Sequence, residues 1–379
     1  MKKKKASSSS SPIRHVWRLC SKLTIFLCVL LSLLAFLNIP QLSQYSKLQT
    51  PSNHRDDHFE GPPKIAFLFL VRRHLPLDFL WAAFFKNGDA ANFSIYIHSE
   101  PGFVFDETTT SSPFFYGRQL KNSIQVVWGE SSMIEAERLL LDKALDDPAN
   151  RRFVLLSDSC VPLYNFGYIY NKVMSSPKSF VDSFLDAKEC RYNPKMSPAI
   201  PEEKWRKGSQ WITLVRRHAE VIVDDDIIFP VFRKFCKRRP PKNLSKRSRI
   251  LNFLAIDFRF LFPWLKPHNC FPDEHYVQTL LAMRGLEGEL ERRTLTYTSW
   301  NQSAIREKRR IWHPITFDYA DANPHKTKEI KDINHVYYES EHRTEFCRIN
   351  SEITPCFLFA RKFTCWAAIR LLNEGFLSP

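Results

Sequence analysis

The second half of the chain contains short groups of charged and aromatic residues whose spacing could support chemistry. One of them, Trp205-Arg-Lys-Gly-Ser-Gln-Trp211, places two tryptophans, two cations and a tight-turn glycine within seven residues. Sugar rings stack on indole faces, and a cation such as Lys207 holds phosphate groups. We therefore predict that Trp205, Lys207 and Trp211 contact a sugar or a nucleotide. Packing of both tryptophans into the core is the alternative for this segment.

Two further groups carry acids and bases. Phe271-Pro-Asp-Glu-His275 precedes an apolar helical spacing, and carboxylates such as Asp273 and Glu274 are also favoured at a helix start simply because they face its dipole. Phe357-Leu-Phe-Ala-Arg-Lys-Phe363 places Arg361 and Lys362 beside an apolar run, with Arg343 shortly before it. Isolated basic residues are usually solvated, whereas two cations at the edge of an aromatic run would suit a pyrophosphate.

Short apolar runs alternate with helical stretches from Lys64 onward, which predicts an α/β fold. The patterns indicate helices over residues 76–86 and 131–145, and strands over residues 64–71, 93–98, 124–128 and 153–157. Such an order makes a Rossmann-like half, in which ligands bind beyond the carboxyl ends of the strands.

Polar groups follow each of these predicted strands. Arg72, Arg73 and His74 follow the first; His98 ends the second; Gly129 to Ser132 follow the third; and Asp158, Ser159 and Cys160 follow the fourth. Asp158 is suited to a ribose or sugar hydroxyl, and His98 or an arginine to a base or phosphate. We predict His98, Asp158 and Ser159 as nucleotide or sugar contacts, with ordinary solvation of strand ends as the alternative.

The N-terminus carries a topology signal. Residues 1–22 carry seven lysines and arginines and no acid, the first acidic residue is Asp56, and residues 23–37 are apolar except for Thr24 and Ser32. These features predict a basic cytosolic tail (1–16), an uncleaved transmembrane signal anchor (17–39), a flexible stem (40–63) and a luminal domain (64–379). The net charge of +15 is therefore mostly a topology signal, and a nucleic-acid-binding function loses its main support.

Composition narrows the remaining possibilities. The chain has 379 residues, 44% of them hydrophobic, which excludes disorder, collagen and coiled coil, and its 10 glycines form neither a dinucleotide fingerprint nor a P-loop. Asn92, Asn243 and Asn301 begin acceptor sequons for glycosylation. Seven cysteines follow the anchor and allow up to three disulfides of open pairing, and zinc is not expected because no C-x-x-C pair occurs.

In this order, the residues resemble the core-2/I-branching β-1,6-N-acetylglucosaminyltransferases and the related peptide O-xylosyltransferases, most closely their plant branch. The resemblance spans about residues 64–365. It rests on six segments: Ile95-Tyr-Ile-His98, Leu155-Leu-Ser-Asp-Ser-Cys-Val-Pro-Leu163, Trp205 to Trp211, Pro272-Asp-Glu-His275, His313-Pro-Ile-Thr-Phe317 and Leu358-Phe-Ala-Arg-Lys-Phe363.

The resemblance implies a Golgi membrane enzyme with a single GT-A-like domain that transfers a sugar from a UDP-sugar to a glycan or glycoprotein, with inversion. Glu274 would correspond to the catalytic base, suited to the task if partial burial raises its pKa. Lys362, with Arg343 as its partner and Arg361 beside it, would hold the donor diphosphate. No metal or other cofactor is expected, because these cations would neutralise the leaving UDP.

Two alternatives remain open. Asp224-Asp-Asp226 contains an Asp-x-Asp pattern, typical of a metal-dependent glycosyltransferase, but it follows residues 216–223, which are predicted to be helical. The protein could also be a non-catalytic luminal carbohydrate-binding or scaffold protein that holds a glycan with Trp128, Trp205 and Trp211. The resemblance allows N-acetylglucosamine, xylose or glucuronic acid as the donor sugar and leaves the acceptor open, with a plant cell-wall polysaccharide or glycoprotein as the analogy.

Overall fold

A computed structural model describes residues 22–32, 59–186, 191–239, 268–300, 314–338 and 340–375. The chain divides into two units, Met1–Ser52 and Asn53–Pro379. In the first unit, residues 22–32 form a helix with exposed apolar side chains such as Leu23 and Phe26. Among the described residues, no helix has both the length and the apolar character needed to cross a bilayer. The rest of the predicted anchor, residues 17–21 and 33–39, lies outside the described residues.

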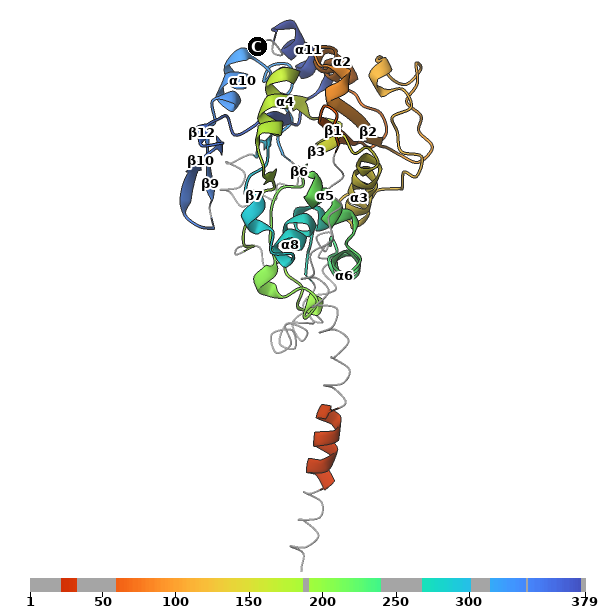
Figure 1. Ribbon diagram of the computed structural model, residues 1–379, viewed down its shortest axis with the longest axis vertical. Helices are drawn as coiled ribbons and strands as arrows, with labels where there is room; N and C mark the ends of the chain where they lie inside the picture. The colour runs from red at the N-terminus through yellow and green to blue at the C-terminus, as the bar shows by residue number, and fades with distance from the viewer. Residues whose placement is uncertain are drawn as a thin grey trace, which may run out of the picture. The chain divides into compact units, whose positions relative to one another are not determined.

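The second unit is built on a six-stranded mixed sheet in the order β2-β1-β3-β6-β5-β7 (Figure 1). Its strands are β1 (Lys64–Leu70), β2 (Phe93–His98), β3 (Asn150–Ser157), β5 (Ser179–Phe180), β6 (Thr213–Val215) and β7 (Leu290–Glu291). β2, β1 and β3 are parallel, β6 is antiparallel to β3 and to β5, and β7 is parallel to β5. The carboxyl ends of β1, β2, β3, β5 and β7 therefore meet along one edge of the sheet, where ligands bind in folds of this class.

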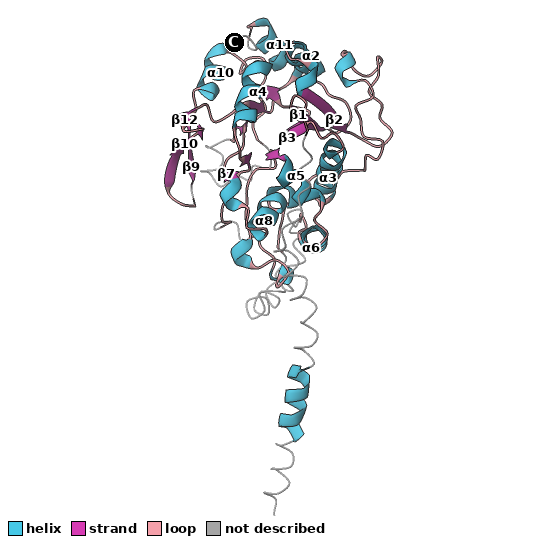
Figure 2. Ribbon diagram, in the orientation of Figure 1, coloured by secondary structure: helices cyan, strands magenta, loops and turns pink. Residues whose placement is uncertain are grey.

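Helices surround this sheet (Figure 2). They are α2 (Asp78–Lys86), α3 (Ser132–Leu145), α4 (Phe166–Ser175), α5 (Arg216–Val223), α6 (Ile228–Phe235), α8 (Tyr276–Met283), α10 (Pro324–Lys331) and α11 (Cys365–Asn373). Single 3-10 turns cover Ala90–Asn92, Pro113–Phe115, Pro194–Met196, Glu202–Lys204, Pro272–Glu274 and Glu287–Glu289. β1 is buried along most of its length, as expected for a strand covered on both faces, and its Phe67 packs edge-on against Trp81 and Phe84 of α2.

A second, three-stranded sheet extends the ligand-binding edge. It has the order β4-β13-β8, formed by β4 (Val161–Pro162), β13 (Phe359–Arg361) and β8 (Thr296–Thr298). Two hairpins flank it: β9 (His335–Tyr338) with β10 (Arg343–Phe346), and β11 (Arg348–Ile349) with β12 (Glu352–Ile353). The backbone N–H of Phe363 donates to the carbonyl of Ser159 at 3.0 Å, which holds the end of β13 against the loop that follows β3.

The structure confirms most of the predicted elements and corrects one. The strands over 64–70, 93–98 and 150–157 and the helices over 78–86 and 132–145 lie where the periodicity predicts them. The predicted strand over 124–128 is wrong, because its backbone groups bond to side chains instead of a ladder: Ile124 N–H donates to His98 Nε2, and Val127 N–H donates to Ser132 Oγ. Val127 and Trp128 are exposed.

Two disulfides resolve part of the cysteine pairing. Cys236 pairs with Cys270, and Cys347 pairs with Cys356. Cys160 is free and buried, and Cys365 is free and exposed. At least two of the three disulfides that the sequence allows are therefore formed. Cys190 lies outside the described residues.

Gly208 occupies a position where a side chain cannot fit. Its backbone N–H donates to the carbonyl of Glu274 at 2.9 Å, while a Cβ at this position would lie 1.7 Å from the carbonyl oxygen of Asp182. The neighbouring Lys207 and Phe184 exchange backbone hydrogen bonds of 2.8 and 2.9 Å. Glycine is therefore required by the close approach of two backbones, and not by a tight turn as its sequence context suggests.

We expect Gly208→Ala to destabilise the protein by several kcal/mol, since the added methyl group must displace the backbone of Asp182. Gly288→Ala is the matched control, because nothing lies within 4 Å of a Cβ built there. Urea unfolding of the full-length variants measures both effects. Equal stability of the two variants would show that the Gly208 approach is not a structural constraint.

Candidate active site

The cation end of the site lies where β3 and β13 finish. Asp158 follows β3 and accepts from Arg72 Nε at 3.0 Å, and Arg72 itself follows β1. Arg361 ends β13, and its guanidinium lies 4.3 Å from the ring centroid of Trp211. Lys362 comes next and is half-buried. Arg72, Arg361 and Lys362 thus lie around Asp158 at the edge where ligands bind.

Arg361 and Lys362 lose hydration on burial, and nearby carboxylates replace only part of it. Burial lowers the pKa of Arg361 despite the opposing charges of Asp158 and Asp273. Burial, followed by the charge of Arg361, also lowers the pKa of Lys362. Two desolvated cations with one shared carboxylate favour an anionic ligand, because its charge offsets the cost of their burial.

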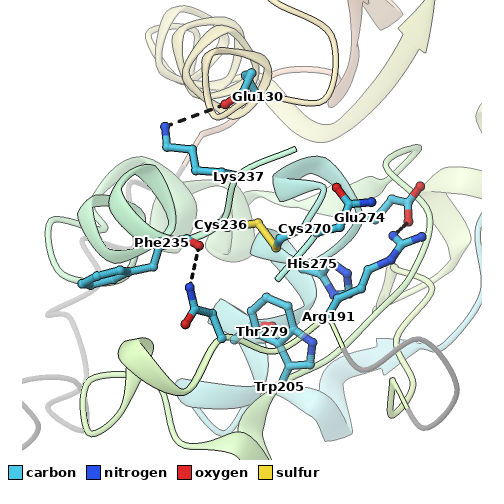
Figure 3. Close-up of a disulfide and its surroundings, with 12 residues drawn as sticks. Glu130, Arg191, Trp205, Phe235, Cys236, Lys237, Cys270, Glu274, His275 and Thr279 are labelled. Atoms are coloured by element: carbon cyan, nitrogen blue, oxygen red, sulfur yellow. Dashed lines mark hydrogen bonds and ion pairs between the residues drawn. A yellow bond between two sulfur atoms is a disulfide. The ribbon is translucent and has the colours of Figure 1, made fainter. Parts of the chain in front are cut away.

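The acid end of the site is the 3-10 turn Pro272–Glu274 before α8. Glu274 Oε2 forms an ion pair with Arg191 Nη1, and the Arg191 guanidinium lies 4.7 Å from the ring centroid of Phe271. Figure 3 shows Glu274 and Arg191 side by side, next to the Cys236–Cys270 disulfide that fixes the start of this turn. The ion pair fixes the orientation of the Glu274 carboxylate.

Asp273 is the more deeply buried of the two acids. Asp273 is 9% exposed, whereas the side chain of Glu274 is 32% exposed. Burial, and then the charge of Glu274, raise the pKa of Asp273 to about 7, although Arg191 and Arg361 oppose the shift. Gly208 N–H donates to the carbonyl of Glu274 at 2.9 Å, and Trp211 of the same segment contacts Arg361, so the segment from Trp205 to Trp211 connects the acid end to the cation end.

A second buried acid supports this site from α3. Glu137 accepts from Gln210 Nε2 at 2.7 Å, and burial raises the pKa of Glu137 well above its usual value. Asp273 adds to that rise. The hydrogen bond to Glu137 fixes Gln210, one residue before Trp211.

Two of the predicted ligand contacts, Trp205 and His98, are buried in the structure. Trp205 is 3% exposed, and its indole stacks against His275 at 4.4 Å and Phe232 at 5.4 Å. The prediction that Trp205 stacks on a sugar is therefore wrong, and the packing alternative holds for this residue. His98 is buried as well, and burial lowers its pKa to about 4. Its Nε2 accepts the Ile124 N–H at 3.1 Å and so orders the following loop, while its Nδ1 has no hydrogen-bond partner among the described residues.

Arg343 is also placed differently from expectation. It lies on β10, bonds Glu341 at 2.6 Å and also pairs with Glu345. Its guanidinium lies 5.1 Å from the ring centroid of Tyr338. The structure describes no contact between Arg343 and Lys362. Arg72 and Arg361 are instead the cations whose charges act on Lys362.

Two further predicted contacts, Ser159 and Lys207, lie on the same edge, whereas Asn92 precedes the amino end of β2. Ser159 is half-buried, with its hydroxyl 3.2 Å from that of Ser157. Lys207 lines a cavity of about 440 Å³ beside the site. Asn92 is half-buried at the start of β2, and Asn243 and Asn301 lie outside the described residues.

The Asp224–Asp226 run has a structural role. Asp224 ends α5, and Asp225 accepts from the backbone N–H of Ile228 at 2.9 Å and of Phe229 at 2.7 Å, and from the Tyr276 hydroxyl at 2.8 Å. Asp225 therefore caps α6. Within the described parts of the chain, no group of three or more His, Cys, Asp or Glu residues could hold a metal ion.

The sequence of this chain matches a known protein family. The family described as Core-2/I-Branching enzyme matches residues 65–331. This chain belongs to that family. It is 55% identical over 320 residues to "Glycosyltransferase BC10" of Oryza sativa subsp. japonica, an alignment that covers 84% of this chain and 78% of the rice protein. Among solved structures, an active-site mutant of LgtC matches with a TM-score of 0.35 and 9% identity, covering 83% of this chain and 96% of LgtC.

Membership of the Core-2/I-Branching family identifies the chain as a glycosyltransferase, as the resemblance implies. Several residues of the candidate active site could not be predicted from the sequence. Arg191 and Glu137 are distant in sequence from Glu274 and Gln210, and only the tertiary fold pairs them. Arg72 is visible as a polar residue after a strand, but its pairing with Asp158 depends on the parallel register of β1 and β3.

We expect Asp273→Asn to change how stability depends on pH. The pKa of Asp273 is about 7 in the fold and about 3.9 in an unfolded chain, so the folded state binds the extra proton between these values. The free energy of unfolding must then fall as pH rises through about 4 to 7.

Replacing the carboxyl by an amide removes this contribution, so Asp273→Asn should exceed the wild type in stability by a few kcal/mol at pH 8 and match it near pH 4. Urea unfolding at pH 4, 6 and 8 measures the difference. Glu107→Gln, which removes an exposed carboxylate, is the control. A pH-independent difference between Asp273→Asn and the wild type would contradict the assignment.

Proposed function

We propose that this glycosyltransferase moves a sugar from a UDP-sugar to a hydroxyl group of a glycan or glycoprotein, with inversion at the anomeric carbon and without a metal ion. The observation that carries the proposal is that one segment, Trp205 to Trp211, contacts both ends of the site: Gly208 N–H donates to the carbonyl of Glu274 at 2.9 Å, and the Trp211 ring lies 4.3 Å from the Arg361 guanidinium. A binding module would need neither group.

In this reaction Glu274 is the base. The acceptor oxygen forms a bond to the anomeric carbon while the bond from that carbon to the diphosphate oxygen breaks, and the acceptor proton passes to Glu274. The Arg191 pair supports this role because it holds the Glu274 carboxylate oriented before the acceptor arrives. Burial and the charge of Glu274 raise the pKa of the neighbouring Asp273 to about 7, so Asp273 carries less negative charge beside Glu274 at neutral pH than an ordinary aspartate would.

The departing UDP is stabilised by cations of the chain. Lys362 and Arg361 would contact the diphosphate, and Arg72 would join them by exchanging Asp158 for a phosphate oxygen. Trp211 supports Arg361 from below, and Asp158 or Ser159 would meet a hydroxyl of the ribose or sugar. Arg343 is left out of this set because Glu341 and Glu345 already pair with it.

The proposed location is the Golgi membrane, with the N-terminus cytosolic and the catalytic domain luminal. The basic tail and the apolar segment after it support this topology. N-acetylglucosamine, xylose and glucuronic acid remain the proposed donor sugars, and Asn92, Asn243 and Asn301 remain proposed glycosylation sites.

We expect Glu274→Gln to lower kcat by about 100-fold or more while UDP affinity stays within about twofold, because the amide keeps the shape but accepts no proton. A UDP-sugar panel with UDP-release detection, run on the full-length chain, provides kcat, and calorimetry provides the UDP affinity. Glu374→Gln, which removes another ion-paired glutamate, is the control. Turnover of Glu274→Gln at the wild-type rate would exclude Glu274 as the base.

We expect transfer to persist in excess EDTA and to depend instead on Lys362. Lys362→Ala should raise the KM for the UDP-sugar by about tenfold or more, because one diphosphate contact is lost. Lys328→Ala, which removes an exposed lysine paired with Asp332, should leave KM unchanged. Loss of activity in EDTA with recovery in Mn²⁺ would overturn the metal-free mechanism.

A further inference from the structure

The hairpin formed by β9 and β10 exposes an aromatic face to solvent. In its register, Tyr337 lies opposite Thr344, and His335 lies opposite Phe346. Because side chains alternate along each strand, these four residues share one side of the hairpin, which we call the hairpin face. Tyr337 is 58% exposed and Phe346 is 54% exposed, and His335 and Thr344 are exposed as well. Figure 1 shows the hairpin at the margin of the second unit.

The charged residues of the two strands lie on the opposite side. Arg343 and Glu345 are in register with Tyr338 and Val336, and Arg343 pairs with Glu345. Within β9 and β10, the hairpin face therefore contains no lysine, arginine, aspartate or glutamate. It offers two aromatic rings, two hydroxyl groups and one imidazole. Such a surface favours a neutral ligand that combines apolar faces with hydroxyl groups, as a sugar ring does.

The hairpin is fixed to the rest of the second unit. At its base, the Cys347 N–H donates to the carbonyl of Asn334 at 2.8 Å, and Cys347 forms a disulfide with the buried Cys356. On its charged side, the Tyr338 hydroxyl donates to the carbonyl of Arg292 at 2.9 Å. The aromatic rings are thus presented on an ordered backbone, which reduces the entropy lost when a ligand binds.

The hairpin face continues into a cavity of about 440 Å³ at the carboxyl ends of β5 and β7. Tyr337, Phe357 and Thr294 line this cavity. Thr294 donates to the carbonyl of Trp211 at 2.6 Å, and the Trp211 ring contacts Arg361 of the candidate active site. Because Tyr337 belongs to both the cavity and the hairpin face, a chain of sugars that begins at the active site would reach this face through the cavity.

The hairpin face is too small for a stable protein partner. β9 and β10 have four residues each. Four residues span about 13 Å and two strands are about 10 Å wide, so the face covers on the order of 100 to 200 Å². A stable protein–protein interface buries about 800 Å² on each partner. A few sugar rings match the smaller area.

We propose that the hairpin face is a second glycan-binding site, which holds a neutral part of the acceptor chain away from the sugar that reacts. The inference rests on the proposed function in that the acceptor is a glycan, and it adds a site that the reaction itself does not need. One sugar ring would stack on Tyr337 and another on Phe346. Contact at this face raises the effective concentration of the acceptor hydroxyl group at Glu274.

Direct binding to the full-length chain tests the site without turnover. Calorimetry in the presence of UDP measures the Kd of cellohexaose, β-1,4-xylohexaose and β-1,4-galactohexaose and of the corresponding disaccharides. We expect at least one hexasaccharide to bind about tenfold or more tightly than its disaccharide, because only the longer chain reaches both the cavity and the hairpin face. Absence of hexasaccharide binding, or equal affinity within every pair, overturns the inference.

Variants connect this length preference to the hairpin face. Phe346 is not among the described residues that line the cavity, so Phe346→Ala tests the face separately. We expect Phe346→Ala and Tyr337→Ala each to weaken hexasaccharide binding by about fivefold or more, and Phe346→Ala to leave disaccharide binding within about twofold. Both side chains are exposed, so the variants keep the fold. Tyr116→Ala, which removes another exposed tyrosine, is the control.

Three outcomes separate this inference from its alternatives. Hexasaccharide binding that is unchanged in both hairpin variants refutes the site. Self-association of the wild type that both variants abolish, measured by sedimentation, would assign the face to a second copy of the chain and also refute the site. Hexasaccharide binding that depends on Tyr337 and Phe346, without transfer from any UDP-sugar, supports the site and refutes only the proposed function.

Discussion

The site depends on the close approach of three backbone segments at Gly208. The carbonyl of Asp182 lies where a Cβ of Gly208 would stand, while Gly208 N–H holds the carbonyl of Glu274. The segment from Trp205 to Trp211 is therefore fixed between the residues after β5 and the turn that carries the acids. Trp205 anchors this segment in the core, and Trp211 supports Arg361 at its other end. One glycine thus sets the relation between the acid end, the cation end and the cavity.

Without a ligand, the buried cations of the site have too few negative charges near them. Arg361 and Lys362 are partly desolvated with Asp158 as their shared carboxylate, and Asp273 is held near its neutral form by burial. Such an arrangement costs stability in the free protein, and an arriving anion recovers part of that cost. The two buried acids, Asp273 and Glu137, avoid adding to the negative charge because each binds its proton more tightly than usual. In the proposed mechanism, the same partly desolvated cations therefore both bind the donor diphosphate and stabilise the leaving UDP.

The sequence predicts the nucleotide half of the fold well, because strands such as 93–98 and helices such as 132–145 carry their own periodicity. It fails at residues 124–128, where an apolar run bonds to His98 and Ser132 in place of a strand. The acid turn and the cations of β13 are recognisable as short motifs, and the structure brings them together. Arg191 and Glu137 are not recognisable, because their partners come from distant segments and a lone arginine or glutamate has no spacing signal. Arg343 is misplaced for the same reason, since its two glutamate partners become neighbours only in the β9–β10 hairpin.

The ligand-binding edge of the sheet offers two different environments. Beyond β1, β3 and β13, three cations and a single carboxylate favour a diphosphate. Beyond β5 and β7, aromatic side chains such as Tyr338 and Phe357 line a cavity of about 440 Å³. Trp211 lies between the two: its ring contacts Arg361, and its carbonyl accepts from Thr294 of the cavity. Gly208 N–H donates to the carbonyl of Glu274, which ties the turn that carries this acid to the segment ending at Trp211. The position of the acid is therefore a consequence of how the backbone connects the two halves.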